Sequence, residues 1–261
     1  MQDHKLSHFP PEREKALANL WRYRIFEIMY YRPNVLLHST RVSWWVKDIA
    51  LIAKKYVKGI DIEKARLAAL VHDDAEMLTG DIPSHHKFFM SKFQAAQTDK
   101  EEKAAIEELS KKYPKKVGNY SYRDLLLQTF YKKSTEGQLV SYLDKLDAYC
   151  ESLHEVLAGN ICHLQSIMYY SRILDRASIT YPKLKIFLQE GNSPVMYVNK
   201  RIYHDYVSAK YAGKFNKPHT AKSLNIESDF PFYNRWRELM VKNLGKSGVR
   251  ELTTQKEFIY K

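Results

Sequence analysis

The sequence predicts an all-α protein, and three observations support this. Only nine of the 261 residues are glycine, about half the usual share of roughly 7% in globular domains. Apolar residues recur at three- and four-residue steps in several long stretches, which is the spacing of one helix face. No Asn-Gly type of hairpin signal separates two such stretches, so we expect no substantial sheet.

The first half of the chain is expected to contain helices at residues 12–31, 39–57, 62–72 and 99–113. Pro33 should end or bend the first of them, and His38 or Ser39 lies at the start of the second. Asp61 is a good N-cap for the third helix. Gly80 and nearby Pro83 predict a turn after it.

The second half is expected to contain helices at residues 121–132, 137–158, 161–211 and about 234–244. The helix at 137–158 has a continuous apolar face, and Gly159 suits its C-terminal end. Breaks are expected at Pro182 and Gly191. Residues 212–233 are polar, aromatic and irregular.

The formal net charge of +12 favours anionic partners, which include nucleotides, nucleic acid and acidic membranes. The excess lysines are scattered rather than concentrated on one element, so nucleic acid is allowed but not favoured. Cys150 and Cys162 form no CxxC pair, which favours a reducing compartment. No apolar run approaches the 18 residues of a membrane span, and the N-terminus lacks a signal-peptide pattern. We therefore expect a cytoplasmic protein without a membrane partner.

Histidines and carboxylates mark three places in the chain: His38, the pair His72-Asp73, and Asp144. Each place lies at a helix boundary or on an apolar helix, where a buried carboxylate needs a cation or a hydrogen-bond donor. Any one of these residues alone is more often an ordinary core or surface residue. As an ordered set, two imidazoles and two carboxylates suit a divalent ion such as Mn, Co, Fe or Zn better than Ca.

The ordered pattern H…HD…D resembles that of the HD-domain metal-dependent phosphohydrolases. The segment HDDAEMLTGDIPS at 72–84 is similar to the HDAxExxTGDxP segment of the bacterial 5'-deoxynucleotidase branch, and 139–160 is similar to its last metal-bearing helix. The resemblance implies an HD-domain helical bundle over residues 1–180. Residues 181–261 would be a helical C-terminal extension packed on it, which caps the site, forms a homodimer or only extends the helical shell.

The resemblance also assigns roles to individual residues. Asp73 would take part in catalysis as a metal ligand, and Glu76 would handle the proton of the attacking water. The branch usually has Glu-His-Ser at the first histidine, whereas this chain has Leu37 before His38, so an acceptor for that imidazole must come from elsewhere. The implied metal ligands are His38, His72, Asp73 and Asp144.

The nucleotide substrate would be held by further residues. Asp81 would lie beside the sugar and favour deoxyribose. The family commonly places an arginine upstream of the first histidine to hold phosphate. Asp147, one helical turn after Asp144, either contacts the nucleoside, orients a ligand or is an ordinary helix charge. The candidates for the phosphate arginine are Arg24 and Arg32, with Arg22 and Trp21 nearby.

Several alternatives stay open. The same ligands would serve a dNTP triphosphohydrolase or a phosphodiesterase, with Mn, Co, Fe, Zn or Mg as the ion. A regulator that binds nucleotides or nucleic acid through a vestigial site is a further alternative. Asp74 is expected to be solvated or to support a ligand. His85 and His86 are expected to be a surface pair, or else the ligands of a second metal.

Overall fold

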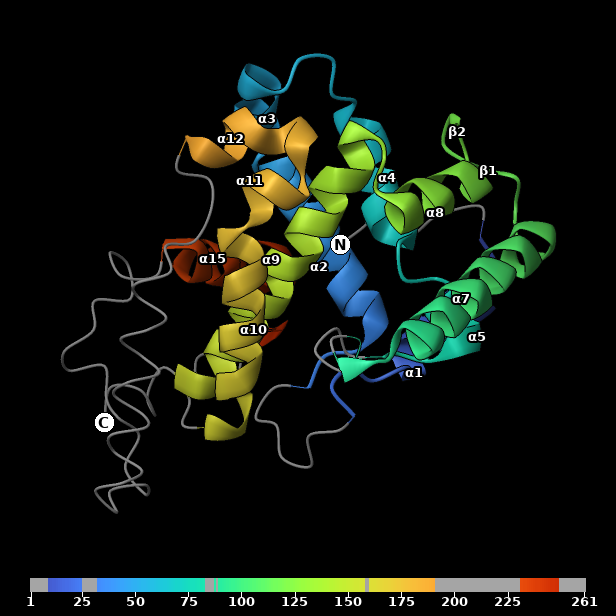
Figure 1. Cartoon of the computed structure of the whole chain (residues 1–261), viewed down its shortest axis with the longest axis horizontal. Coiled ribbons are helices and arrows are strands. Elements are labelled where there is room, and N and C mark those ends of the chain that lie inside the picture. The colour runs from blue at the N-terminus through green and yellow to red at the C-terminus, as the bar shows by residue number, and fades with distance from the viewer. Residues whose placement is uncertain are drawn as a thin grey trace. The chain divides into compact units, whose positions relative to one another are not determined.

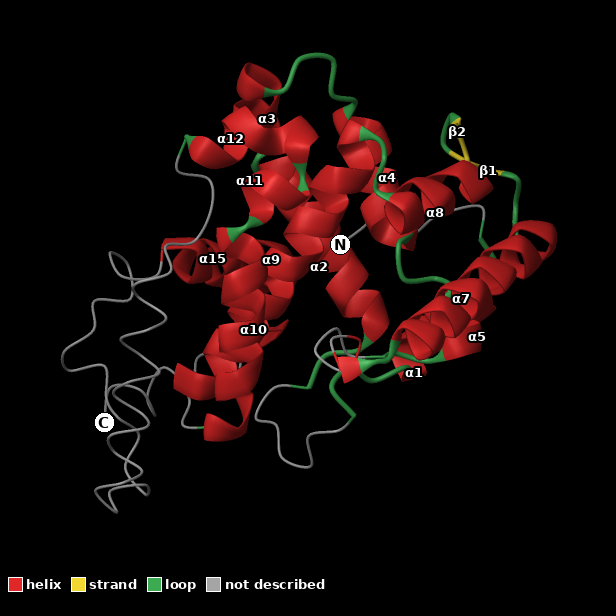
Figure 2. Cartoon of the chain, viewed as in Figure 1, coloured by secondary structure: helices red, strands yellow, loops and turns green. Residues whose placement is uncertain are grey.

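The structure, a computed structural model, describes residues 9–24, 32–82, 87, 89–157, 160–190 and 231–248. Their regular secondary structure is almost entirely helical (Figure 2). Within the described residues the only strands are β1 (Lys116–Val117) and β2 (Tyr120–Ser121), a two-residue antiparallel pair. The predicted all-α fold is confirmed.

The described residues divide into two compact units. One ends at Asp144 and the other begins at Lys145, so the boundary lies within α9 (Thr135–Leu157), a single continuous helix. The predicted division after residue 180 between a core and an extension stays a prediction. Among the described residues, no helix combines the length and the apolarity needed to cross a membrane.

The first unit is built around α2 and α4, which pack against each other (Figure 1). Small residues on α4, among them Ala65, Ala68 and Ala69, are buried and allow the two backbones to approach closely. Helix α7 contacts both α5 and α8. The helices that the structure bounds in this unit before α9 are α1 (Pro11–Asn19), α2 (Val35–Asp48), α3 (Ala50–Tyr56), α4 (Ile62–Val71), α5 (Glu76–Thr79), α7 (Lys92–Lys112) and α8 (Tyr122–Tyr131).

The predicted helix at 12–31 is wrong beyond Asn19. Leu20 is extended, Trp21 pairs with Asn34 in an isolated antiparallel bridge, and the Arg22 N–H donates to the Pro33 carbonyl at 3.1 Å. These backbone groups are therefore satisfied by the segment before α2 instead of by a helix. The rest of the predicted helix, residues 25–31, lies outside the described residues.

Helix boundaries explain the other differences. Helix α2 begins at Val35 because the Asn34 side chain accepts from the Leu37 N–H at 2.8 Å, so His38 lies inside the helix and not at its start. The predicted 39–57 helix is interrupted at Ile49, which has non-helical dihedrals. Helix α7 begins seven residues earlier than expected, since Ser91 and Gln94 form a capping box.

Two predicted local signals are confirmed. The Asp61 carboxylate caps α4 by accepting from the Lys64 N–H at 2.9 Å. Gly80 ends α5 with a φ of 78°, a left-handed value that glycine adopts without a steric penalty.

The second unit contains the remainder of α9 and the helices that follow it. Its described elements are η1 (Ile161–His163), α10 (Leu164–Asp175), α11 (Ala177–Thr180), η2 (Pro182–Leu184), α12 (Lys185–Gln189) and α15 (Pro231–Gly248). The predicted break at Pro182 is confirmed. The predicted break at Gly191 lies outside the described residues, and so does the predicted irregular segment 212–233 as far as residue 230. Helix α15 begins before the predicted Asn234, and Gly245 interrupts its helical dihedrals.

Candidate metal centre

Helix α2 places His38 in the interior, where its side chain is fully buried. Its Nε2 lies 3.1 Å from Asp144 Oδ1 and 3.6 Å from Asp73 Oδ2. On the other side of the ring, Arg22 Nη1 donates to Nδ1 at 2.6 Å. Because arginine can only donate, the ring accepts at Nδ1 and carries its proton on Nε2. The partner of Nδ1 is thus a donor, not the acceptor that we expected.

His72 follows the last residue of α4 and has the opposite tautomer. Its Nδ1–H donates to the Ala69 carbonyl at 2.8 Å, which leaves Nε2 with an unprotonated lone pair. This Nε2 atom is buried and makes no hydrogen bond with the described residues, although it lies 3.2 Å from Asp73 Oδ2. A buried lone pair without a donor is costly unless a cation or a water occupies the place in front of it.

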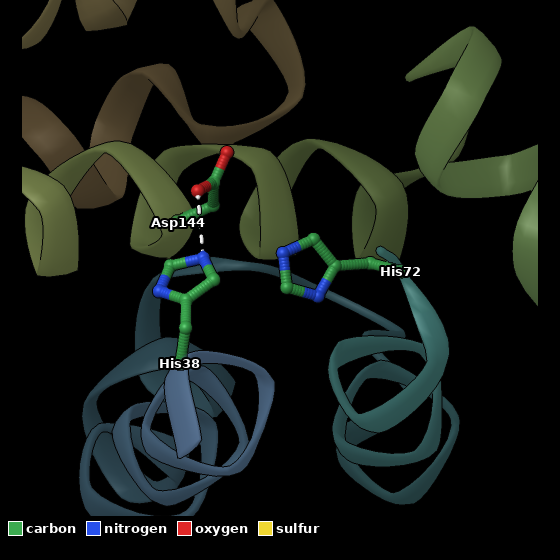
Figure 3. Close-up of side chains that lie close together, drawn as sticks. All are labelled: His38, His72 and Asp144. Atoms are coloured by element: carbon green, nitrogen blue, oxygen red, sulfur yellow. Dashed lines mark hydrogen bonds and ion pairs between the residues drawn. The ribbon is translucent and has the colours of Figure 1, made fainter. Parts of the chain in front are cut away.

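The side chains of His38, His72 and Asp144 point toward one another from α2, from the end of α4 and from α9 (Figure 3). One ligand atom from each of the three lies within 4.8 Å of the others. Asp73 belongs to the same group, because its Oδ2 lies between 3 and 4 Å from both imidazole Nε2 atoms. All four predicted ligands are therefore close together; that they bind metal stays a prediction.

These four residues form a set of ligand donors, the donor set, and its chemistry fits a divalent first-row ion. Two imidazole nitrogens and two carboxylates form a mixed N/O set, and His72 already offers the tautomer that a metal requires. His38 needs one adjustment, because a neutral ring that binds through Nε2 must move its proton to Nδ1. In the present structure the His38 proton is on Nε2 and faces the Asp144 carboxylate. A cation bound at Nε2 would take the place of this proton.

Asp74 is buried, so the solvated alternative for it is wrong. Arg13 donates to both of its oxygens, from Nε at 2.7 Å and from Nη2 at 2.6 Å, and the Tyr122 hydroxyl donates at 2.7 Å. Arg13 also donates to the Leu70 carbonyl at 2.8 Å. Burial and the Asp74 carboxylate raise the pKa of Tyr122, so this hydroxyl stays a donor. These contacts hold the end of α4 and the turn after it.

Glu76 and Asp81 add two more carboxyl groups to the surroundings of Asp73. Burial raises the pKa of Glu76 well above its usual value, and the neighbouring Asp73 and Asp81 carboxylates raise it further. Burial also raises the pKa of Asp81, although the Arg22 guanidinium opposes the shift. Asp81 accepts from the Tyr23 N–H at 3.3 Å. A raised pKa makes a carboxylate a stronger base, as an acid/base group requires.

The upstream arginines differ in their surroundings. Arg22 is buried and contacts His38, whereas Arg24 is exposed and Arg32 is half-buried. Arg22 is thus the arginine at the donor set, a placement that the sequence reasoning missed. Helical spacing could not have found it, because the residues between Arg22 and His38 do not form one helix. The pairing of Trp21 with Asn34 carries Arg22 there.

Two further predictions concern Asp147 and the pair His85 and His86. Asp147 is fully buried, and its Oδ1 accepts from Trp236 Nε1 at 2.8 Å. The donor is supplied by the chain itself, which fits an orienting role; contact with a nucleoside stays a prediction. His85 and His86, considered for a second metal, lie outside the described residues.

Curated relatives resemble this chain over part of its length. Proteins named 5'-deoxynucleotidase from Yersinia pestis (strain Pestoides F) and Yersinia pseudotuberculosis serotype O:3 (strain YPIII) are 34% identical over 128 residues. The match covers 49% of this chain and 64% of each relative. The chain therefore spans less than two thirds of the length of these relatives.

Solved structures resemble the fold. An HD-domain phosphohydrolase from Listeria innocua superposes with a TM-score of 0.54 at 20% identity, covering 74% of this chain and 96% of the other. A protein from Pyrococcus horikoshii OT3 gives a TM-score of 0.52 at 22% identity, with the same coverage. The predicted HD-domain helical fold is confirmed.

The match to a protein family is longer and contains the whole donor set. Residues 17–195 match the family described as 5'-deoxynucleotidase YfbR-like. That range is more than half of the chain, and it includes the elements that carry His38, His72, Asp73 and Asp144. The chain belongs to the YfbR-like 5'-deoxynucleotidase family.

Proposed function

We propose that this protein is a metal-dependent phosphohydrolase that converts 5'-deoxynucleoside monophosphates into deoxynucleosides and inorganic phosphate. The observation that carries the proposal is the unbonded, buried Nε2 of His72, which lies in one group with His38, Asp73 and Asp144. Family membership and the names of the curated relatives support the substrate class.

The four donors would hold a divalent ion, for which Mn, Co, Fe, Zn and Mg are the candidates. A bound ion lowers the pKa of its water and neutralises phosphate charge. His72 is held for this role by its bond to the Ala69 carbonyl. Asp73 is held by the anchored turn in which its neighbour Asp74 is fixed by Arg13.

Glu76 would act as the acid/base group. In the reaction the water oxygen forms a bond to phosphorus, the bond from phosphorus to the 5'-oxygen breaks, and the leaving oxygen gains a proton. The Glu76 carboxylate takes the proton of the water and can return one to the leaving oxygen. The raised pKa of Glu76 makes its carboxylate a stronger base, so that it accepts the proton of the water more readily and holds it for transfer to the leaving oxygen.

Arg22 and Asp81 would contact the substrate. If His38 binds an ion through Nε2, its Nδ1 carries a proton and can no longer accept from Arg22. The guanidinium then loses this acceptor, and in this proposal it binds a phosphate oxygen, which arginine can do bidentately. Asp81 is placed for the deoxyribose in this proposal, while Arg24 and Arg32 remain candidates for the remaining phosphate contacts.

The test is a release assay on dNMPs, NMPs, dNTPs and cyclic dinucleotides with Mn²⁺, Co²⁺, Mg²⁺ and Zn²⁺, after the protein has been stripped with a chelator. We expect inorganic phosphate from dNMPs only when an ion is added back. His72→Gln should lose both ion binding and turnover. Release of triphosphate would instead identify a dNTP triphosphohydrolase, and opening of cyclic dinucleotides a phosphodiesterase. Nucleotide binding without turnover under every condition would favour the regulator.

A further inference from the structure

Helix α9 carries a stripe of polar residues that continues past the donor set. Asp144, Asp147, Glu151 and His154 follow one another at steps of three, four and three, so they lie along one face of the helix. The last three are buried. Such groups need hydrogen-bond partners within the protein.

Helix α15 supplies partners to two residues of this stripe. Trp236 Nε1 donates to Asp147 Oδ1 at 2.8 Å, and both residues are buried. The Tyr233 hydroxyl and His154 Nδ1 share a hydrogen bond at 2.7 Å. The Tyr233 and Trp236 rings stack with centroids 5.9 Å apart, and the His154 ring lies 5.5 Å from that of Trp236. The two helices are therefore joined by two hydrogen bonds in an aromatic cluster.

The position of this cluster in the chain sets it apart from the family's shared part. Helix α15 begins at Pro231, whereas the family match ends at residue 195. Asp147 lies one helical turn beyond Asp144 on the same helix. A residue outside the matched part of the chain thus contacts the helix that carries a predicted metal ligand.

We propose that Trp236 is a positioning residue for the metal centre, with Tyr233 in support. By holding Asp147, Trp236 restrains the turn of α9 that also carries Asp144, and with it the direction in which Asp144 presents its carboxylate. The inference rests on the proposed function, because it assumes that Asp144 binds the ion. Ligand distances in metal sites are constrained to about 0.2 Å, so a small displacement of the helix is enough to weaken binding.

The test compares three variants of the full chain by direct measurement of Mn²⁺ affinity in calorimetric titration. Trp236→Phe removes the indole N–H and keeps an aromatic ring, and Tyr233→Phe removes only the hydroxyl. Met240→Ala is the matched control, because Met240 is fully buried on the same helix and its truncation weakens the packing while the Trp236 indole N–H stays in place. Thermal unfolding of each variant sets a common temperature at which all are folded.

We expect Trp236→Phe to weaken Mn²⁺ binding roughly 10-fold, the lower end of what loss of a ligand-supporting contact costs. Tyr233→Phe should weaken it less, and it keeps the proposal testable if Trp236→Phe does not fold. Met240→Ala should lower the melting temperature and leave the Mn²⁺ affinity within twofold of wild type. Amide hydrogen exchange should become faster around residues 144–148 in Trp236→Phe and not in the control.

Two results would overturn the positioning role. One is an unchanged Mn²⁺ affinity in both aromatic variants, and the other is an equal loss in Met240→Ala, which would indicate general loosening. Failure of the proposed function is detected separately, by measuring phosphate release by the wild-type protein. If the wild type binds Mn²⁺ but releases no phosphate, the hydrolase proposal fails while the ratio of affinities still decides the role of Trp236.

Discussion

Asp73 and Asp74 are neighbours in the sequence, but their carboxylates lie in two chemically different regions. Asp74 belongs to an anchor in which Arg13 and Tyr122 satisfy both of its oxygens. Asp73 belongs to the donor set, where its Oδ2 faces the Nε2 atoms of two imidazoles. The anchor is saturated by the chain itself, whereas the donor set contains a buried lone pair on His72 that the described residues leave unbonded.

This difference separates a structural charge from a functional one. A buried ion pair with complete hydrogen bonding needs no further ligand to compensate its charges. Removal of one partner leaves an uncompensated charge. A group of carboxylates and imidazole lone pairs is stable only with a cation or protons among its members. Removal of a carboxylate should therefore destabilise the anchor and relieve the metal-free donor set.

Asp73→Asn should have the largest effect. The variant keeps the size of the side chain but loses the charge of a predicted ligand, so we expect phosphate release and tight Mn²⁺ binding to be abolished. The helical circular dichroism signal and the melting temperature of the metal-free protein should be unchanged or slightly increased, because a like charge beside Glu76 is removed. Full activity with ion still bound would break the comparison, since Asp73 would then not be a ligand.

Glu76→Gln should slow turnover by roughly 10²–10⁴ because the amide cannot take a proton from water. Mn²⁺ affinity should stay close to that of the wild type, since Glu76 is not proposed as a ligand. Glu63→Gln is the matched control: Glu63 is an exposed carboxylate on α4 that pairs with Arg66. Turnover at the wild-type rate in Glu76→Gln would remove Glu76 from the acid/base role.

Asp74→Asn should give the reverse of the Asp73 result. It leaves the buried Arg13 charge uncompensated, which typically costs 3–5 kcal/mol, here measured as the free energy of unfolding in urea. The folded fraction, assayed at low temperature, should still bind Mn²⁺ and release phosphate, with a partial loss of affinity because the contact of Arg13 with Asp74 also helps to hold Asp73. If Asp74→Asn lost metal binding while its stability was unchanged, the assignment would be wrong: Asp74 would be the functional carboxylate and not the structural one.

Local signals in the sequence predicted much of the fold. Asp61 and Gly80 marked helix ends correctly, because a cap or a left-handed turn depends on a few adjacent residues. The failure at 12–31 has a different cause: the backbone of Leu20–Arg22 pairs with residues 33–35, and this long-range pairing leaves no periodic signal.

The predicted site shows the same division. His38, His72, Asp73 and Asp144 were found from an ordered pattern, and the structure places them close together. The hydrogen bonds of Arg13 with Asp74 and of Trp236 with Asp147 join residues 61 and 89 positions apart. No spacing rule predicts such pairs. The polar residues at helical spacing on the buried face of α9 indicate only that Asp147 needs a hydrogen-bond donor from another element.

The smallest expected effect is a pH dependence of stability in the metal-free protein. The pKa of Glu76 is raised above its ordinary value of 4.5 by burial and by the Asp73 and Asp81 carboxylates. The folded state therefore binds the Glu76 proton more tightly than the unfolded state does. The resulting stabilisation is complete below the unfolded pKa and is lost as the pH rises through the folded pKa.

The measurement is urea unfolding in chelator at a series of pH values, for wild type and Glu76→Gln. Other carboxyl groups titrate in the same range, so the quantity of interest is the difference between the two proteins. Wild type should lose stability relative to Glu76→Gln as the pH rises above about 4.5, because only wild type must bury an additional negative charge. Mn²⁺ should reduce this difference, since a cation among the ligands offsets the repulsion between Glu76 and Asp73. Parallel curves for the two proteins would mean that folding does not change the pKa of Glu76. The Asp73 carboxylate would then not repel a charged Glu76.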